Sequence, residues 1–149
     1  MTAVETNTSN LKNLEDLFDL FAVDKKRATG GVPFTLGGTT FQIARANNPR
    51  HAAFMQAAYA ILYEQFKTPE SRETPEFEEA LEAKIKEGIK KHVILGWDAI
   101  KLQGKVYEGP SDEGYAILLQ LDELVDILLS FANNRKNYAP VVLEEDAKN

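Results

Sequence analysis

The chain of 149 residues contains no cysteine, a single tryptophan and two histidines. The lack of cysteine excludes disulfides, a thiolate nucleophile and cysteine-based zinc sites. His51 and His92 stand far apart and form no HExxH-like pair. We place His92 on the apolar face of a helix, where a core histidine is more common than a metal ligand. We therefore expect no metal site and no cofactor.

Other common features are also missing. No apolar run approaches the ~20 residues that a membrane-spanning helix needs. The opening MTAVETNTSN has neither the basic nor the apolar region of a secretory signal. A net charge of −6 disfavours nucleic acids and anionic membranes as partners, because both attract cationic surfaces. A basic or amphipathic protein partner fits this charge better.

The sequence also lacks the local patterns of common catalytic sites. TGGVPFTLGG contains no GxGxxG and no GK[ST] before a helix, so its glycines indicate turns. No serine lies in a nucleophile-elbow pattern. The 23 acidic residues form either solvated faces or a docking face for a cationic segment, and the sequence leaves both open. We expect a protein that is not an enzyme.

The length and composition indicate one folded domain. We expect a flexible N-terminus over residues 1–9, one helical domain over 10–139 and a flexible acidic tail over 140–149. The domain has an N-terminal half, 10–67, and a C-terminal half, 74–139. Its expected class is mainly α (α+β), with about five helices and one β-hairpin in the N-terminal third.

Capping residues locate the central helices. Asn48 followed by proline predicts a helix that runs to about Phe66. Because most of its circumference is apolar, we expect it to be the central helix of the domain. Thr74 followed by proline predicts a second helix, which reaches about Leu95 and ends at Gly96.

The remaining segments are shorter. KKRATGG is expected to break a first helix that Ser9 caps. Alternating residues at 32–36 and 39–45 around Gly37-Gly38 predict the hairpin. Residues 97–107 are irregular, with two short strands around Gln103-Gly104 as one interpretation. Ser111 caps a further helix, and 121–133 forms the last one.

Two apolar stripes are candidates for binding a partner. At helical spacing, the first lies on the N-terminal helix and the second on the last helix; both could instead pack in the core. The stripes comprise Leu14, Leu17, Phe18, Phe21 and Leu124, Ile127, Leu128, Phe131. Trp97, with Tyr107 and Tyr115 beside it, is predicted to be a structural anchor in the core.

The order of these features resembles a known family. The hairpin followed by ARANNPRHAAFMQAAY is similar to the N-terminal half of tail assembly chaperones of long-tailed bacteriophages. GWDAIKLQGKVYEGPSDEGYAILLQLDELVDILLSFANNRKNY resembles their C-terminal half. The resemblance covers about residues 28–138. It is carried by Trp97, Gly104, Pro110, Tyr115 and the ending Phe131-Ala132-Asn133.

The resemblance implies a binding function without catalysis. Such chaperones keep the long helical tape measure protein soluble in the host cytoplasm while tail tube subunits polymerise around it, and they are usually absent from the virion. A programmed frameshift often adds a longer form, and Ala147-Lys148-Asn149 allows a slippery codon run. The implied partners are the tape measure protein, the tail tube protein, the longer form and further copies of the chain.

Two other functions remain open. The first is a structural tail or connector protein of the virion, although the few predicted strands disfavour it. The second is an acidic binding module, such as an antitoxin or an enzyme inhibitor.

Overall fold

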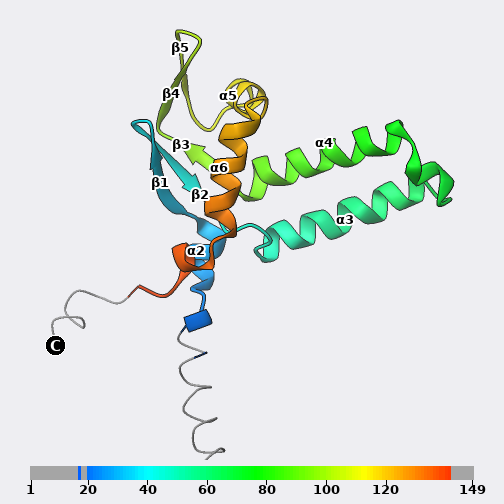
Figure 1. The fold of residues 1–149 in the computed structure, drawn as a ribbon, viewed down its shortest axis with the longest axis horizontal. Helices are drawn as coiled ribbons and strands as arrows, with labels where there is room; N and C mark the ends of the chain where they lie inside the picture. The colour runs from blue at the N-terminus through cyan, green and yellow to red at the C-terminus, as the bar shows by residue number, and fades with distance from the viewer. Residues whose placement is uncertain (1–16, 18–19, 142–149) are drawn as a thin grey trace, which may run out of the picture.

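The computed structural model describes residue 17 and residues 20–141 (Figure 1). This part of the chain contains five α-helices and two small antiparallel sheets, so the fold is mixed α+β. The expectation of a single hairpin is therefore wrong. Four of the five helices correspond to predicted ones, the helix at Lys25–Gly30 does not, and most of the predicted first helix lies outside the described residues. The elements are α2 (Lys25–Gly30), β1 (Val32–Leu36), β2 (Thr39–Ile43), α3 (Pro49–Gln65), η1 (Glu70–Glu73), α4 (Pro75–His92), β3 (Ile94–Trp97), β4 (Ala99–Leu102), β5 (Lys105–Glu108), α5 (Asp112–Leu118), α6 (Asp122–Asn133) and η2 (Arg135–Tyr138).

The predicted hairpin forms two strands of a three-stranded sheet. β1 and β2 pair in antiparallel register around Gly37 and Gly38, which both have positive φ. β3 pairs with the other edge of β2, with Trp97 opposite Phe41. The second helix of the pair therefore ends at His92, and the prediction that it continues to Leu95 is wrong. Hydrogen bonds to β2 hold the apolar segment after His92 as a strand. The helical spacing of apolar residues in this region did not indicate that strand.

The second sheet is the short hairpin of β4 and β5. Its turn is Gln103-Gly104, where both residues have positive φ. This confirms the interpretation of residues 97–107 as two short strands.

A short helix occupies the segment that was expected to be a break. α2 begins after Asp24, whose Oδ1 accepts hydrogen bonds from the backbone N–H groups of Lys26 and Arg27 at 2.9 and 3.1 Å. An aspartate at the N-cap satisfies helix donors that have no partner within the helix. Six residues fit before Gly31, whose φ of 86° ends the helix.

A helical hairpin, which we call the arm, consists of α3, η1 and α4 and connects the neighbouring strands β2 and β3 (Figure 1). Both predicted starts are confirmed. Asn48 caps α3, and Thr74 caps α4 by accepting a hydrogen bond from the Phe77 N–H. The arm extends away from the two sheets and the other helices, and α3 packs mainly against α4.

The position of α3 contradicts the expectation of a central helix. Only Ala58 and Leu62 of this helix are buried. Most of the circumference of α3 is indeed apolar. In the described part of the chain, however, α4 covers one side of α3 and no other element covers the opposite side. An apolar circumference predicts that a helix has neighbours, and it does not show whether they belong to the same chain.

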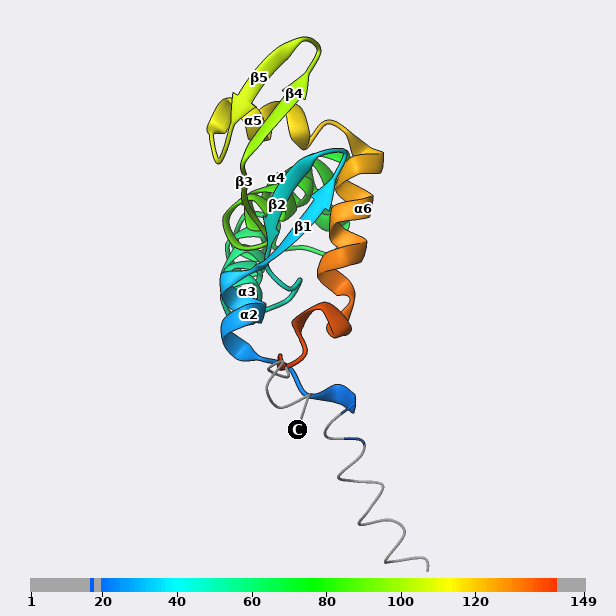
Figure 2. The same ribbon diagram turned by 90° about the vertical axis from the view of Figure 1, so that its left-hand side faces the viewer.

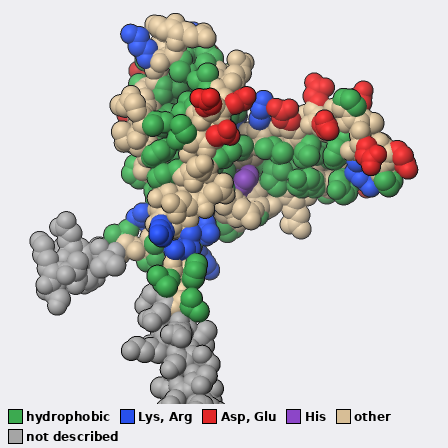
Figure 3. Space-filling view, viewed as in Figure 1, with side chains coloured by type: hydrophobic (Ala, Val, Ile, Leu, Met, Phe, Trp, Pro, Cys, Tyr) green, Lys and Arg blue, Asp and Glu red, His purple; other side chains and the backbone are tan. Residues whose placement is uncertain are grey.

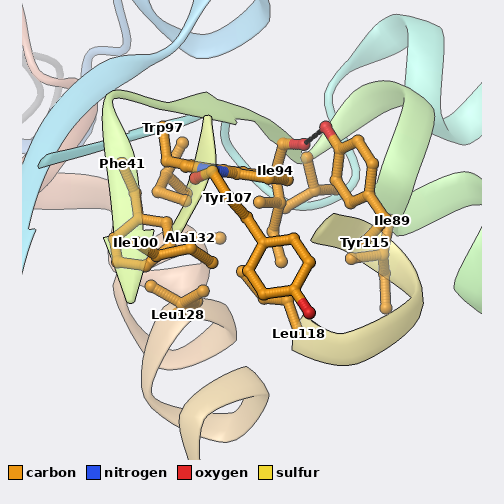
Figure 4. Packing of buried hydrophobic residues seen from close by; sticks show 12 residues of the cluster. Phe41, Ile89, Ile94, Trp97, Ile100, Tyr107, Tyr115, Leu118, Leu128 and Ala132 are labelled. Atoms are coloured by element: carbon orange, nitrogen blue, oxygen red, sulfur yellow. Dashed lines mark hydrogen bonds between the residues drawn. The ribbon is translucent and has the colours of Figure 1, made fainter. Parts of the chain in front are cut away.

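The core lies between the three-stranded sheet, the end of α4, and helices α5 and α6. It joins residues of both halves of the chain, among them Phe41, Ile94, Leu118 and Leu128 (Figure 4). α6 lies beside the three-stranded sheet (Figure 2), and Phe131 stacks on Phe34 with ring centroids 4.4 Å apart. Ser111 caps α5, as predicted.

Candidate functional site: an exposed apolar arm

The root of the arm is held by one buried side chain. Oδ1 of Asn48 accepts hydrogen bonds from the N–H groups of Arg50 and His51. Its Nδ2 donates to the carbonyls of Arg45 at 2.7 Å and His92 at 2.9 Å. Asn48 thus joins the start of α3 to the end of α4, and it is itself only 3% exposed.

The two helices approach closely at Gly88. A Cβ at this position would lie 3.1 Å from Phe54, 3.2 Å from the Met55 sulfur and 3.3 Å from His51. Burial lowers the pKa of both His51 and His92 near this crossing. Neutral imidazoles suit their places, because the His51 Nδ1 accepts a hydrogen bond from the Asn47 N–H and the His92 ring packs on Phe54.

Farther from the root, large apolar side chains of the arm face solvent. Four of them, which we call the arm surface, are Tyr59, Ile61, Tyr63 and Ile85, with exposed fractions of 41%, 48%, 52% and 38%. Tyr59 and Tyr63 contact each other edge to face, and Tyr63 also packs near Phe77. Figure 3 shows hydrophobic side chains gathered along the arm. At 3.6 residues per turn, Tyr59 and Tyr63 lie on one side of α3 and Ile61 lies on the other. Contiguous exposed apolar patches mark sites of interaction with other molecules, and Tyr59 and Tyr63 form such a pair.

Charge is absent from the outer turns of α3 and concentrated at the far end of the arm. Residues 52–63 contain no charged side chain. Residues 64–82, which we call the acidic tip, hold seven glutamates against one lysine and one arginine, a net charge of −5. In Figure 3 acidic side chains line the upper edge and the end of the arm. The arm surface therefore adjoins a strongly negative region.

A second apolar hollow lies between the two β-hairpins. This groove has a volume of about 400 Å³ and is lined by Leu36, Leu102 and Leu124, together with the glycine turn of the first hairpin. Phe41 is an aromatic residue in its lining. This groove is the second candidate docking site.

The predicted partner stripes have different outcomes. Leu14 and Phe18 lie outside the described residues. Leu17 and Phe21 are exposed, and Arg135 packs over the Phe21 ring at 5.0 Å. Both remain candidates for contact with a partner.

The stripe on the last helix divides between the core and the surface. Leu128 is fully buried, so its assignment to a partner surface is wrong and the alternative of core packing holds. Phe131 is partly buried and stacks on Phe34. Leu124 lines the groove and Ile127 is exposed. α6 turns one side to the sheet, so that Leu128 is buried while the neighbouring Ile127 is exposed.

Trp97 is the structural anchor that the sequence predicts. Its Nε1 donates a hydrogen bond to the Tyr107 carbonyl at 3.0 Å, and its ring meets Tyr115 edge to face at 4.9 Å. The Tyr115 hydroxyl donates to the Ile94 carbonyl (Figure 4), and burial raises the pKa of Tyr115 to about 12. All three side chains are buried.

The described residues contain no group of three or more His, Asp or Glu side chains that could hold a metal ion. The lowered pKa values of Glu87 and Asp112 come from their hydrogen bonds to Lys91 and Lys90. Within the same part of the chain, no helix has the length and apolarity to cross a membrane.

The arm surface is the feature that sequence reasoning missed. Its signal was visible in HAAFMQAAYAILY, which is uncharged apart from its histidine and carries large apolar side chains on more than one side. We interpreted this pattern as burial within the domain. Comparison with known proteins adds no assignment, because no family model, curated protein or solved structure matches the chain.

Proposed function

We propose that this protein is a non-catalytic chaperone that binds an apolar helical client through the arm surface. The observation that carries the proposal is α3 itself, whose residues 52–63 carry no charge and whose Tyr59, Ile61 and Tyr63 are exposed. The cost of exposing such a helix is offset when a partner covers it. Two parallel or antiparallel helices that present an apolar face are a common receptor for an amphipathic helix.

The client that this proposal names is the tape measure protein of a long-tailed bacteriophage. The choice of client depends on the resemblance described above, since such proteins are long, helical and prone to aggregate. Tyrosine suits the receptor side, because its ring contributes large apolar area while its hydroxyl tolerates water before the client binds. The acidic tip would favour client segments that carry lysine or arginine.

The same proposal places the protein in the host cytoplasm and outside the mature virion. The tail tube protein and a frameshifted longer form of the chain are its further proposed partners. Detection of the chain in purified virions would instead favour the alternative of a structural tail protein.

Co-expression tests the proposal. The chain is produced with the large helical protein encoded next to it, and the soluble fraction of that client is measured. We expect the wild-type chain to keep the client soluble, and Tyr59→Ser/Tyr63→Ser to lose most of this effect. Val106→Ser is the matched control, since Val106 is exposed to a similar degree on β5. An insoluble client with the wild-type chain, or equal rescue by the tyrosine variant, would contradict the proposal.

A further inference from the structure

The charges of this chain are separated along the arm. The acidic tip accounts for a net charge of −5 out of −6 for the protein. Of its seven glutamates only Glu82 has an ion-pair partner among the described residues, Lys86 at 3.2 Å. The tip therefore presents several carboxylates with no cation close to them.

The opposite end of the arm is basic. Six cations gather around α2, η2 and the start of α3, where Figure 3 shows a blue cluster. This group, which we call the basic foot, comprises Lys25, Lys26, Arg45, Arg50, Arg135 and Lys136. Its parts are joined by contacts between α2 and η2 and by the hydrogen bond from the Arg45 N–H to the Ala28 carbonyl. In the described part of the chain, none of the six forms an ion pair.

From this arrangement we infer that two copies of the chain pair through their arms in antiparallel orientation, about a two-fold axis that crosses the arm near Tyr59. An antiparallel pair brings each acidic tip to the partner's basic foot. The uncharged, apolar part of α3 then meets its own counterpart. A two-fold contact must be complementary to itself, and an arm with one negative and one positive end satisfies this condition.

The size of the arm is sufficient for such a contact. α3 has 17 residues and is about 25 Å long, and two packed helices are about 20 Å wide. The resulting face is about 500 Å² on each partner, or about 1,000 Å² for the pair, which is near the lower limit for a specific interface. Tyr59 lies just beyond the middle of α3 and Tyr63 lies two residues before its end, and aromatic side chains contribute strongly to binding. The charged ends lie at the rim, where they set orientation and association rate.

The pairing of two copies does not depend on the proposed function, but it affects how a client binds. A second copy would cover the apolar side chains to which a client binds. The dimer would then be the form that protects the arm surface while no client is present. Client binding would convert the dimer into a complex of one chain with the client.

Sedimentation velocity of the full chain over a wide concentration range tests the pairing. We expect a species of twice 16.6 kDa that dissociates on dilution. Raising the salt from about 0.1 M to about 1 M shortens the screening length from ~10 Å to ~3 Å and is expected to weaken the dimer at least tenfold. Tyr59→Ser/Tyr63→Ser is expected to be a folded monomer by circular dichroism, and Val106→Ser a dimer.

Charge reversal tests the orientation. Glu→Lys at Glu70, Glu73, Glu76 and Glu79 changes the charge of the tip from −5 to +3. Substitution of glutamate at Lys25, Lys26, Arg50 and Lys136 changes the charge of the foot from +6 to −2, and all eight positions are exposed. Each variant alone is expected to be monomeric at concentrations where the wild type is dimeric. An equimolar mixture of the two is expected to form a heterodimer, because each reversed end then meets an opposite charge. A wild type that stays monomeric, a dimer that the tyrosine substitutions leave intact, or a mixture that does not associate would overturn the inference.

Discussion

Gly114 lies in a helix at a position where alanine is expected to destabilise the protein. A Cβ at Gly114 would lie 2.4 Å from Cζ2 and 3.0 Å from Cη2 of Trp97. Carbon atoms in favourable contact are about 3.5–4.0 Å apart. The alanine can therefore fit only if the indole ring or α5 moves.

The indole has little freedom to move. Its Nε1 is hydrogen-bonded to the Tyr107 carbonyl, and Tyr115 packs against it edge to face. Gly109 lies equally close, since a Cβ there would be 2.0 Å from Cε2 of the same ring. Overpacking of a core typically costs about 1–3 kcal/mol. Because Trp97 is confined by these contacts, we expect Gly114→Ala to lose about 2–3 kcal/mol in the free energy of unfolding.

The sign of this effect separates packing from helix propensity. At an open helical position, alanine is favoured over glycine by about 1 kcal/mol. Gly30, the last residue of α2, is the matched control, because nothing lies within 4 Å of a Cβ built there. We expect Gly30→Ala to be neutral or slightly stabilising.

Urea unfolding followed by circular dichroism at 222 nm measures both variants and a double-mutant cycle with Trp97→Phe. Phenylalanine lacks the outer indole atoms, so Gly114→Ala should cost at least 1 kcal/mol less in that background. A Gly114→Ala protein as stable as the wild type, or strict additivity in the cycle, would refute the close packing of Trp97 on α5.

Two further predictions concern the root of the arm. Asn48→Ala removes the cap of α3 and the hydrogen bonds to two carbonyls. It should lower the free energy of unfolding by about 2–3 kcal/mol in urea titrations. Thr74→Ala removes a single cap bond and should lower it by about 1 kcal/mol. Equal losses in the two variants would contradict the role of Asn48 in joining the helices. Folding lowers the pKa values of His51 and His92, whereas histidines of the unfolded chain keep a pKa near 6.5. Below that pH, the unfolded chain therefore binds more protons than the folded chain. Stability should therefore fall as the pH decreases from about 7.5 to about 5.5, and this decrease should shrink in His51→Gln/His92→Gln. An unchanged pH dependence in thermal unfolding would count against partly buried neutral imidazoles.

Local signals in the sequence predicted most of the elements. Asn48, Thr74 and Ser111 cap the helices that they were expected to cap, and Gly37-Gly38 forms the expected turn. These residues act through hydrogen bonds and backbone angles within a few positions of themselves. The sequence alone is sufficient to locate such features.

The errors concern interactions between distant segments. The strand after His92 exists because β2 lies beside it, and no local pattern distinguishes it from the end of a helix. Leu128 and Ile127 are adjacent in the sequence, but only Leu128 faces the sheet. The prediction that α3 is the central helix is wrong for the same reason. An apolar face indicates that a helix packs against something, but the pattern does not identify the partner.

The candidate site was predictable only in part. The anchor of Trp97, Tyr107 and Tyr115 follows from aromatic residues placed between glycines and turns, and the structure places all three in the core. The arm surface required knowledge that α3 and α4 form a projecting hairpin. The concentration of glutamate in 64–82 was visible in the sequence, but its position at the far end of that hairpin was not.

Hydrogen exchange of the chain, free and in complex with its client, tests the docking role of the arm most directly. We expect backbone amides of α3 around Tyr59 and Tyr63 to exchange more slowly in the complex, while the exchange rates of α6 amides around Ile127 change little. Slower exchange in α6 and around the groove at Leu36, with α3 unchanged, would contradict the docking role.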